Sequence, residues 1–147
     1  MADILRQKIV LFVDDEPEWV ESYVDELQAR TVDARLERSI DQADQFLQKN
    51  LEHIALLILD IMMPPGQMFS HGGTEQGLRT GMKLYEKIRK NAPELPIIML
   101  TNVRDERVKK RFSREPHCWF LNKRGTLPHE LADKVQSILK SKEKRDQ

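Results

Sequence analysis

Three short, almost wholly apolar runs constrain the fold of this chain more than any other feature of its sequence. They span residues 9–13, 54–59 and 97–100, and each is rich in branched side chains. Runs of this length and composition are typical of strands buried on both faces of a sheet. Two weaker segments, the alternating residues 32–37 and the short run 117–121, are typical of strands with one exposed face. We therefore expect five strands, with the weaker two at the edges of the sheet.

Apolar residues between these segments recur with the spacing of helices. Ser39 followed by Gln42 also predicts a helix N-terminus, because the serine hydroxyl can accept a backbone hydrogen bond there. The apolar stripes are Trp19, Val20, Tyr23, Val24 and Leu27; Ala43, Phe46, Leu47 and Leu51; Leu84, Tyr85 and Ile88; Val108 and Phe112; and Leu131, Val135, Ile138 and Leu139. Strict alternation of strands and helices indicates a parallel sheet covered on both faces, and right-handed crossovers leave few topologies. We expect an α/β fold with a doubly wound, five-stranded parallel sheet in the order 2-1-3-4-5, which is the flavodoxin-like arrangement.

Length and composition indicate a single domain over residues 1–147. Hydrophobic residues make up 39% and charged residues 33% of the 147, which is enough apolar material for a core. We expect the core over about residues 8–139, a long Gly- and Pro-containing loop over 62–80, and a charged tail over 140–147 that frays. No apolar run is long enough to cross a membrane and no signal segment opens the chain. We therefore expect a cytoplasmic protein that has no membrane contact.

Polar side chains that can carry chemistry follow the central strands. Asp14 and Asp15 follow the first strand, Asp60 follows the third, Thr101 ends the fourth, and Lys123 comes shortly after the fifth. In an open α/β sheet, ligands bind beyond the carboxyl ends of the strands, near the point where the strand order reverses. We therefore expect three carboxylates, a hydroxyl and an amine to converge at one edge of the sheet.

This combination of groups favours phosphoryl chemistry with a metal ion. Three neighbouring carboxylates repel one another unless a cation lies among them, and oxygen ligands suit Mg²⁺. An aspartate can also act as a nucleophile on phosphorus and form an aspartyl phosphate. The transferred group then needs positive charge and hydrogen-bond donors, which Lys123 and Thr101 could supply.

The order of these motifs resembles a response-regulator receiver domain of two-component signalling, of the stand-alone, single-domain type. The resemblance is carried by the acid pair Asp14-Asp15, the run Leu59-Asp60-Ile61-Met62-Met63-Pro64, Thr101, the aromatic Phe120 and Lys123. It implies that Asp60 accepts a phosphoryl group from a histidine kinase or a histidine phosphotransfer protein. It also implies that Mg²⁺ is bound by Asp15, Asp60 and the Met62 carbonyl, with Asp14 acting through a water, and that Thr101 and Phe120 form the switch pair.

The same resemblance implies an output through protein contacts. In receivers the downstream partner commonly meets the face formed by the fourth helix, the fifth strand and the last helix. Here that face carries a basic run over residues 104–114, which indicates an acidic partner. The run is short and mixed with acids, so we expect no nucleic-acid binding. We expect no turnover beyond Mg²⁺-dependent self-phosphorylation from a donor and self-dephosphorylation.

Three departures from the receiver pattern affect these expectations. Arg124 follows Lys123 where receivers usually have a proline in a cis peptide bond, and Asn102 follows Thr101 where small residues are common and could restrict access to the site. Met62 and Val103 are apolar and cannot orient a hydrolytic water, so we expect a long-lived phosphoryl group. The loop over 66–80 is long enough to shield the site or contact a partner.

Other functions remain open at the level of sequence. A degenerate receiver, which binds partners without being phosphorylated, is favoured by Arg124 and the long loop but disfavoured by the complete acid triad. A second alternative is a phosphatase that resembles the haloacid dehalogenases, which carry a D-x-D motif after the first strand. Here the two acids after the first strand are adjacent, and the candidate nucleophile Asp60 follows the third strand. Flavin binding on the same fold is disfavoured because an acidic first loop would repel the flavin phosphate.

Overall fold

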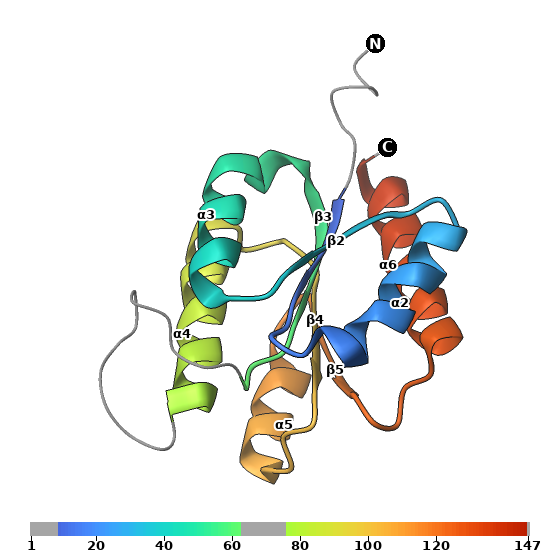
Figure 1. Ribbon diagram of the computed structural model, residues 1–147. Helices are drawn as coiled ribbons and strands as arrows, with labels where there is room; N and C mark the ends of the chain where they lie inside the picture. Colours follow the sequence, from blue (N-terminus) through green and yellow to red (C-terminus); the bar gives the residue numbers. More distant parts are fainter. Residues whose placement is uncertain (1–8, 63–75, 147) are drawn as a thin grey trace.

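A sheet of five parallel strands lies between two layers of helices (Figure 1). The computed structural model describes residues 9–62 and 76–146. Its elements are β1 (Ile9–Val13), α2 (Pro17–Ala29), β2 (Asp33–Glu37), α3 (Ile40–Asn50), the 3₁₀ turn η1 (Leu51–His53), β3 (Ile54–Leu59), α4 (Gln76–Asn91), β4 (Ile97–Thr101), α5 (Glu106–Arg114), β5 (Cys118–Asn122) and α6 (Pro128–Asp146). Within the described ranges, no helix is both long enough and apolar enough to span a bilayer.

The strands are ordered β2-β1-β3-β4-β5, and each neighbouring pair is parallel. The expected fold class and strand order are therefore confirmed, with the two weaker segments at the edges. β5 begins one residue later than expected, because His117 has φ 56°, a left-handed conformation that does not continue a strand. β4 extends to Thr101, so this buried hydroxyl lies at the carboxyl end of the strand.

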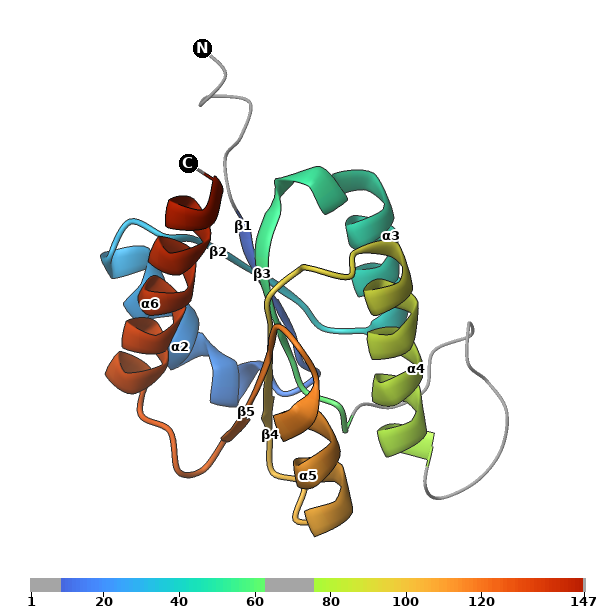
Figure 2. The ribbon, with the colours of Figure 1, turned by 180° about the vertical axis from the view of Figure 1, so that it is seen from behind.

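Alternate residues of the central strands face opposite helix layers, as strand geometry requires. On β1, for example, Leu11 packs in the core beneath α3, α4 and α5, whereas Phe12 packs in the core beneath α2 and α6. Figure 2 shows these two layers from behind, with α2 and α6 on one side of the sheet and α3 and α4 on the other. In the first layer, the rings of Tyr85 and Phe112 meet edge to face with their centroids 5.0 Å apart, which joins α4 to α5.

Ser39 Oγ accepts a hydrogen bond from the Gln42 backbone N–H, so the expected N-cap of α3 is confirmed. The apolar stripes of the helices are mostly buried, as the periodicity predicts, with two exceptions. Leu51 lies in η1, one residue after α3 ends. Trp19 is 41% exposed, because it lies in the first turn of α2, at the edge of its apolar stripe.

Two segment boundaries also differ from the sequence expectation. Residues 76–80, which we placed in the long loop, form the first part of α4, while the rest of that loop, from 63 to 75, lies outside the described residues. Residues 140–146, which we placed in a separate charged tail, continue α6, and the expected fraying of this end stays a prediction. The lysine, glutamate and arginine residues of this segment have high helix propensity, and this favours continuation of the helix.

Gly81 holds α4 close to the segment that follows Asp60. A Cβ atom at position 81 would overlap the backbone oxygen, Cα and carbonyl carbon of Ile61. Backbone atoms cannot move aside as a flexible side chain can, so only glycine permits this approach. The small residue therefore fixes the position of α4 relative to the carboxyl end of β3.

We expect Gly81→Ala to lower the free energy of unfolding. Alanine favours a helix over glycine by about 1 kcal/mol, but overpacking against backbone costs about 1–3 kcal/mol and more when nothing can yield. The matched control is Gly125→Ala, because the nearest atoms to a Cβ there lie 3.8 Å away. Urea unfolding of both variants checks the prediction, and a Gly81→Ala protein as stable as Gly125→Ala would contradict it.

Candidate functional site

The carboxyl ends of four strands bring the expected polar residues together. Asp14 follows β1, Asp60 follows β3, Thr101 ends β4, and Lys123 follows β5. All four are buried, and Lys123 is only 1% exposed. Asp15 lies beside them and is partly exposed. The sheet thus gathers at one edge all the groups that the sequence placed at strand ends.

Both oxygens of the Asp60 carboxylate accept hydrogen bonds. Oδ1 accepts one from the Thr101 hydroxyl at 2.8 Å and one from the Met62 backbone N–H at 2.9 Å. Oδ2 accepts a hydrogen bond from the Lys123 ammonium at 2.9 Å. A carboxylate oxygen has about two lone-pair sites, so Oδ1 is saturated by its two donors, whereas Oδ2 accepts only one hydrogen bond from the residues that the structure describes.

The Lys123 ammonium joins the ends of β1 and β3. Its Nζ lies 2.7 Å from Asp14 Oδ2, 2.9 Å from Asp60 Oδ2 and 3.6 Å from Glu16 Oε1. Burial alone would lower the pKa of Lys123, but the hydrogen bonds to Asp14 and Asp60 outweigh it and raise the pKa above its ordinary value. The lysine therefore stays charged at neutral pH, and two buried carboxylates share its positive charge.

Asp14 accepts a hydrogen bond from the loop that follows it, and its burial makes ionisation unfavourable. Its Oδ1 accepts a hydrogen bond from the Glu16 backbone N–H at 2.8 Å. Burial raises the pKa of Asp14 to about 6, although the hydrogen bonds from Lys123 and Glu16 oppose the shift. Because the folded-state pKa lies above the ordinary value of 3.8, ionising Asp14 reduces stability as pH rises from about 4 to 6. Burial also raises the pKa of Asp15.

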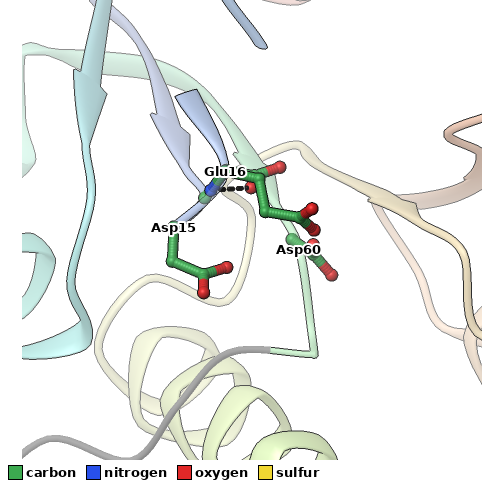
Figure 3. Close-up of side chains that lie close together, drawn as sticks. Asp15, Glu16 and Asp60 are labelled. Carbon is green, nitrogen blue, oxygen red and sulfur yellow. Dashed lines mark hydrogen bonds between the residues drawn. The ribbon is translucent and has the colours of Figure 1, made fainter. Parts of the chain in front are cut away.

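The carboxylates form a set that fits a hard divalent cation. One oxygen from each of Asp14, Asp15, Glu16 and Asp60 lies within 4.8 Å of the others. Figure 3 shows the side chains of Asp15 and Glu16, from the loop after β1, beside that of Asp60 at the end of β3. Carboxylate oxygens are the ligands that Mg²⁺ prefers, so the donor set fits the expected ion. Glu16 was not among the expected ligands, although its position beside the acid pair could have indicated it.

Met62, Thr101 and Phe120 lie in different surroundings. Met62 reaches the site through its N–H, which donates to Asp60, and its side chain is exposed. The Thr101 hydroxyl already lies on Asp60, and it also accepts a weak hydrogen bond from the Val103 N–H at 3.4 Å. The Phe120 ring is partly buried against the core beneath α5.

The segment that follows Lys123 is fixed by side chains that the sequence did not point to. No peptide bond in the described ranges is cis, so the Lys123–Arg124 bond is trans. The Arg124 N–H donates to Asn102 Oδ1 at 3.1 Å and to Asn122 Oδ1 at 2.9 Å. The buried Tyr23 hydroxyl, which the sequence pattern placed only in the core, contacts the carbonyl oxygen of Lys123 at 2.9 Å.

These contacts define what the site can do chemically. A carboxylate lies under an ammonium and a hydroxyl, next to a set of oxygen ligands for a cation. A negatively charged electrophile, such as a phosphoryl group, would find hydrogen-bond donors and a positive charge at this site. The arrangement suits transfer of a phosphoryl group to Asp60 better than it suits hydrolysis of a neutral substrate.

Comparison with solved structures finds the same fold in several proteins. A response regulator receiver domain protein from Clostridium thermocellum aligns with a TM-score of 0.73 and 18% identity, covering 92% of this chain and 97% of that one. A CheY-like response regulator receiver domain protein from Methanospirillum hungatei JF-1 aligns with a TM-score of 0.72 and 21% identity, covering 94% and 98%. The receiver domain of the Francisella response regulator 1452 gives 0.72 and 19%, covering 91% and 98%.

Sequence comparison agrees with the fold. No curated protein matches the chain at a significant level. The family model for the response regulator receiver domain, however, matches residues 10–136, which include all the strand ends that form the site. The chain therefore belongs to the response regulator receiver domain family of two-component signalling.

Proposed function

We propose that this protein is a phosphorylation switch that accepts a phosphoryl group on Asp60 from a histidine kinase or a histidine phosphotransfer protein. Membership of the receiver family supports phosphorylation-type signalling in general. The observation that carries the finer proposal is the Asp60 carboxylate itself, which meets Thr101 on one oxygen and Lys123 on the other. Both donors would remain beside the phosphoryl group after transfer.

The reaction exchanges one bond to phosphorus for another. A lone pair of Asp60 Oδ2 attacks the phosphorus atom, and an O–P bond forms. The bond from phosphorus to the donor imidazole nitrogen breaks, and that nitrogen keeps the electron pair and takes up a proton. Lys123 and Thr101 then donate hydrogen bonds to the phosphoryl oxygens, which carry more negative charge than the carboxylate did.

Asp14, Asp15 and Asp60 would hold Mg²⁺, with Glu16 as a further carboxylate near the site. When bound, the ion would neutralise charge on the transferring phosphoryl group. The residues of this chain set the conditions for that binding, because Lys123 already offsets the charge of Asp14 and Asp60. The Met62 carbonyl stays an expected ligand.

The switch would act through the residues at the ends of β4 and β5. New acceptor oxygens on Asp60 stabilise the state in which Thr101 and Lys123 reach them, so the population shifts toward that state. We propose that Phe120, on β5, changes its packing behind Thr101 as this happens. The face of α5, β5 and α6 would then present a different surface to a downstream partner.

Three exposed apolar side chains on segments next to the site favour a protein as the phosphodonor. Among the described residues, the large hydrophobic side chains that are exposed are Trp19, Met62 and Leu127. Each lies on a segment that continues from the site: Trp19 in the first turn of α2, Met62 two residues after Asp60, and Leu127 in the loop after Lys123. A protein that docks over the site could bury these side chains, whereas a small phosphodonor could not.

The basic side of the molecule favours an acidic downstream partner. A shallow groove on α5 is lined by Arg107, Lys110, Arg111, Arg114 and Glu115. Arg111 is paired with Glu86 at 3.0 Å, whereas Lys110 and Arg114 have no ionic partner among the described residues. Unpaired charge of one sign on one helix favours steering of a partner with the opposite charge.

We expect one phosphoryl group to add to the wild-type protein when it is incubated with Mg²⁺ and acetyl phosphate. Intact-mass spectrometry checks this, and Asp60→Asn should show no addition because the nucleophile is gone. Asp44→Asn is the matched control, since Asp44 is also a buried aspartate but pairs with Lys87 on the helix layer away from the site. Addition to Asp60→Asn, or none to the wild type in the presence of Mg²⁺, would overturn the proposal.

We expect the affinity for Mg²⁺ to fall as pH decreases from about 7 to 5. The pKa of Asp14 is about 6, so a proton competes with the cation for this carboxylate below that pH. Calorimetric titration with MgCl₂ at several pH values measures the effect, and Asp14→Asn should show weaker binding with a shallower pH dependence. Equal affinity for the wild type at pH 5 and pH 8 is the result that would contradict this.

We expect the phosphoryl group to persist once the donor is removed. The side chains two positions beyond Asp60 and Thr101 are Met62 and Val103, which cannot hold a hydrolytic water in place. Met62→Gln should shorten the lifetime several-fold, because its amide can hydrogen-bond a water beside the phosphoryl group. Leu127→Gln, which changes another exposed apolar side chain, should not. Rapid loss of the group from the wild type would show the reasoning to be wrong.

The runner-up is a receiver that binds partners without phosphorylation. Arg124 in place of proline favours it, but the trans peptide leaves Lys123 in contact with Asp60 all the same. The mass measurement separates the two functions, because only the switch adds a phosphoryl group.

A further inference from the structure

The parallel ladder between β4 and β5 continues past the end of the sheet through a side chain. Thr101 lies opposite Asn122 in the register of the two strands, and the Lys123 N–H donates to the Thr101 carbonyl at 3.0 Å. At the next residue, the Arg124 N–H donates to the Asn102 side-chain oxygen at 3.1 Å. The Asn102 amide thus supplies an acceptor across the two chains just beyond the backbone pairing.

This contact joins the residue directly after Thr101 to the residue directly after Lys123. Thr101 and Lys123 contact the two oxygens of the same Asp60 carboxylate, at 2.8 Å and 2.9 Å. Both contacts depend on the relative position of the two strand ends. The bond between Asn102 and Arg124 bridges the two strand ends at this point.

The rest of the turn is fixed from other directions. Asn122 Oδ1 accepts hydrogen bonds from the N–H groups of Arg124 and Gly125 at 2.9 Å and 3.0 Å. On the opposite side, the Tyr23 hydroxyl contacts the carbonyl oxygens of Lys123 and Thr126 at 2.9 Å and 2.6 Å. Asn122 holds the turn within itself, and Tyr23 holds it to α2; among the described side chains, Asn102 ties it to the end of β4.

We propose that Asn102 is a positioning residue for phosphoryl transfer: by accepting the Arg124 N–H it fixes Lys123 relative to Thr101 and Asp60. The inference rests on the proposed function, since it concerns the same site. The Asn102 side chain, which could also restrict access to the site, is engaged with the neighbouring turn. Lys123 has a long, flexible side chain, so a loosened backbone would let its ammonium leave the reactive geometry, and small misplacements are costly in catalysis.

The test compares Asn102→Ala with the wild type in phosphorylation by acetyl phosphate at saturating Mg²⁺. We expect the rate to fall about fivefold to tenfold, the order of one lost neutral hydrogen bond. The Kd for Mg²⁺ should stay within about twofold, because Asn102 contacts none of the four carboxylates of the site. Asn102→Asp keeps an acceptor for the Arg124 N–H and should restore most of the rate.

Two further variants separate positioning from a general loss of structure. Asn50→Ala removes another asparagine side chain that bonds one backbone group, the Phe46 carbonyl at the end of α3, and should leave the rate unchanged. Arg124→Pro removes the N–H donor, so adding Asn102→Ala to that variant should cause no further loss of rate.

The outcomes are distinct. A slower Asn102→Ala with unchanged Mg²⁺ affinity and rescue by aspartate supports the inference. A rate within about twofold of the wild type overturns it and leaves the proposed function intact. Loss of rate, Mg²⁺ affinity and melting temperature together also overturns it, because the role is then structural. A wild-type protein that takes up no phosphoryl group shows that the proposed function itself has failed.

Discussion

The buried ammonium of Lys123, shared between Asp14 and Asp60, is the interaction on which the site depends. Two carboxylates that leave water together repel each other, and each needs a cation or hydrogen-bond donors to stay ionised. Lys123 meets this need from 2.7 Å and 2.9 Å. Burial still raises the pKa of Asp14 to about 6, so holding its ionised form in the folded protein reduces stability.

The fold supplies the distances that this interaction requires. β1 and β3 are adjacent in the sheet, and β4 and β5 follow in order, so their carboxyl ends reach one edge together. The residues that surround the site then fix individual side chains: Gly81 lets α4 approach the segment after Asp60, and Tyr23 holds the turn after Lys123 from α2. The layers of helices therefore position the site as well as covering the sheet.

Much of this was accessible from sequence, because it depends on periodicity and on strand ends. Branched apolar runs predicted the strands, the weaker segments predicted the edges, and the polar residues after each run predicted the meeting of Asp14, Asp60, Thr101 and Lys123. Contacts made through the backbone were not accessible. The sequence around Asn102 does not indicate that its side chain accepts a hydrogen bond from the Arg124 N–H. Tyr23 fits an apolar helix stripe whether or not its hydroxyl contacts the Lys123 carbonyl. The start of α4 was not accessible either, because Gly77 and Gly81 lower the helix propensity of its first residues, although the helix includes them.

The central claim is that the phosphoryl group is carried by the carboxylate of Asp60, and locating the modified atom tests it most directly. Sodium borohydride reduces an acyl phosphate to an alcohol but leaves a free carboxylate unchanged, so treatment of the phosphorylated protein followed by peptide sequencing by mass spectrometry identifies the residue. The account predicts homoserine at position 60, and only after incubation with the phosphodonor. Homoserine at another aspartate, or a phosphoryl group that resists borohydride, would contradict it.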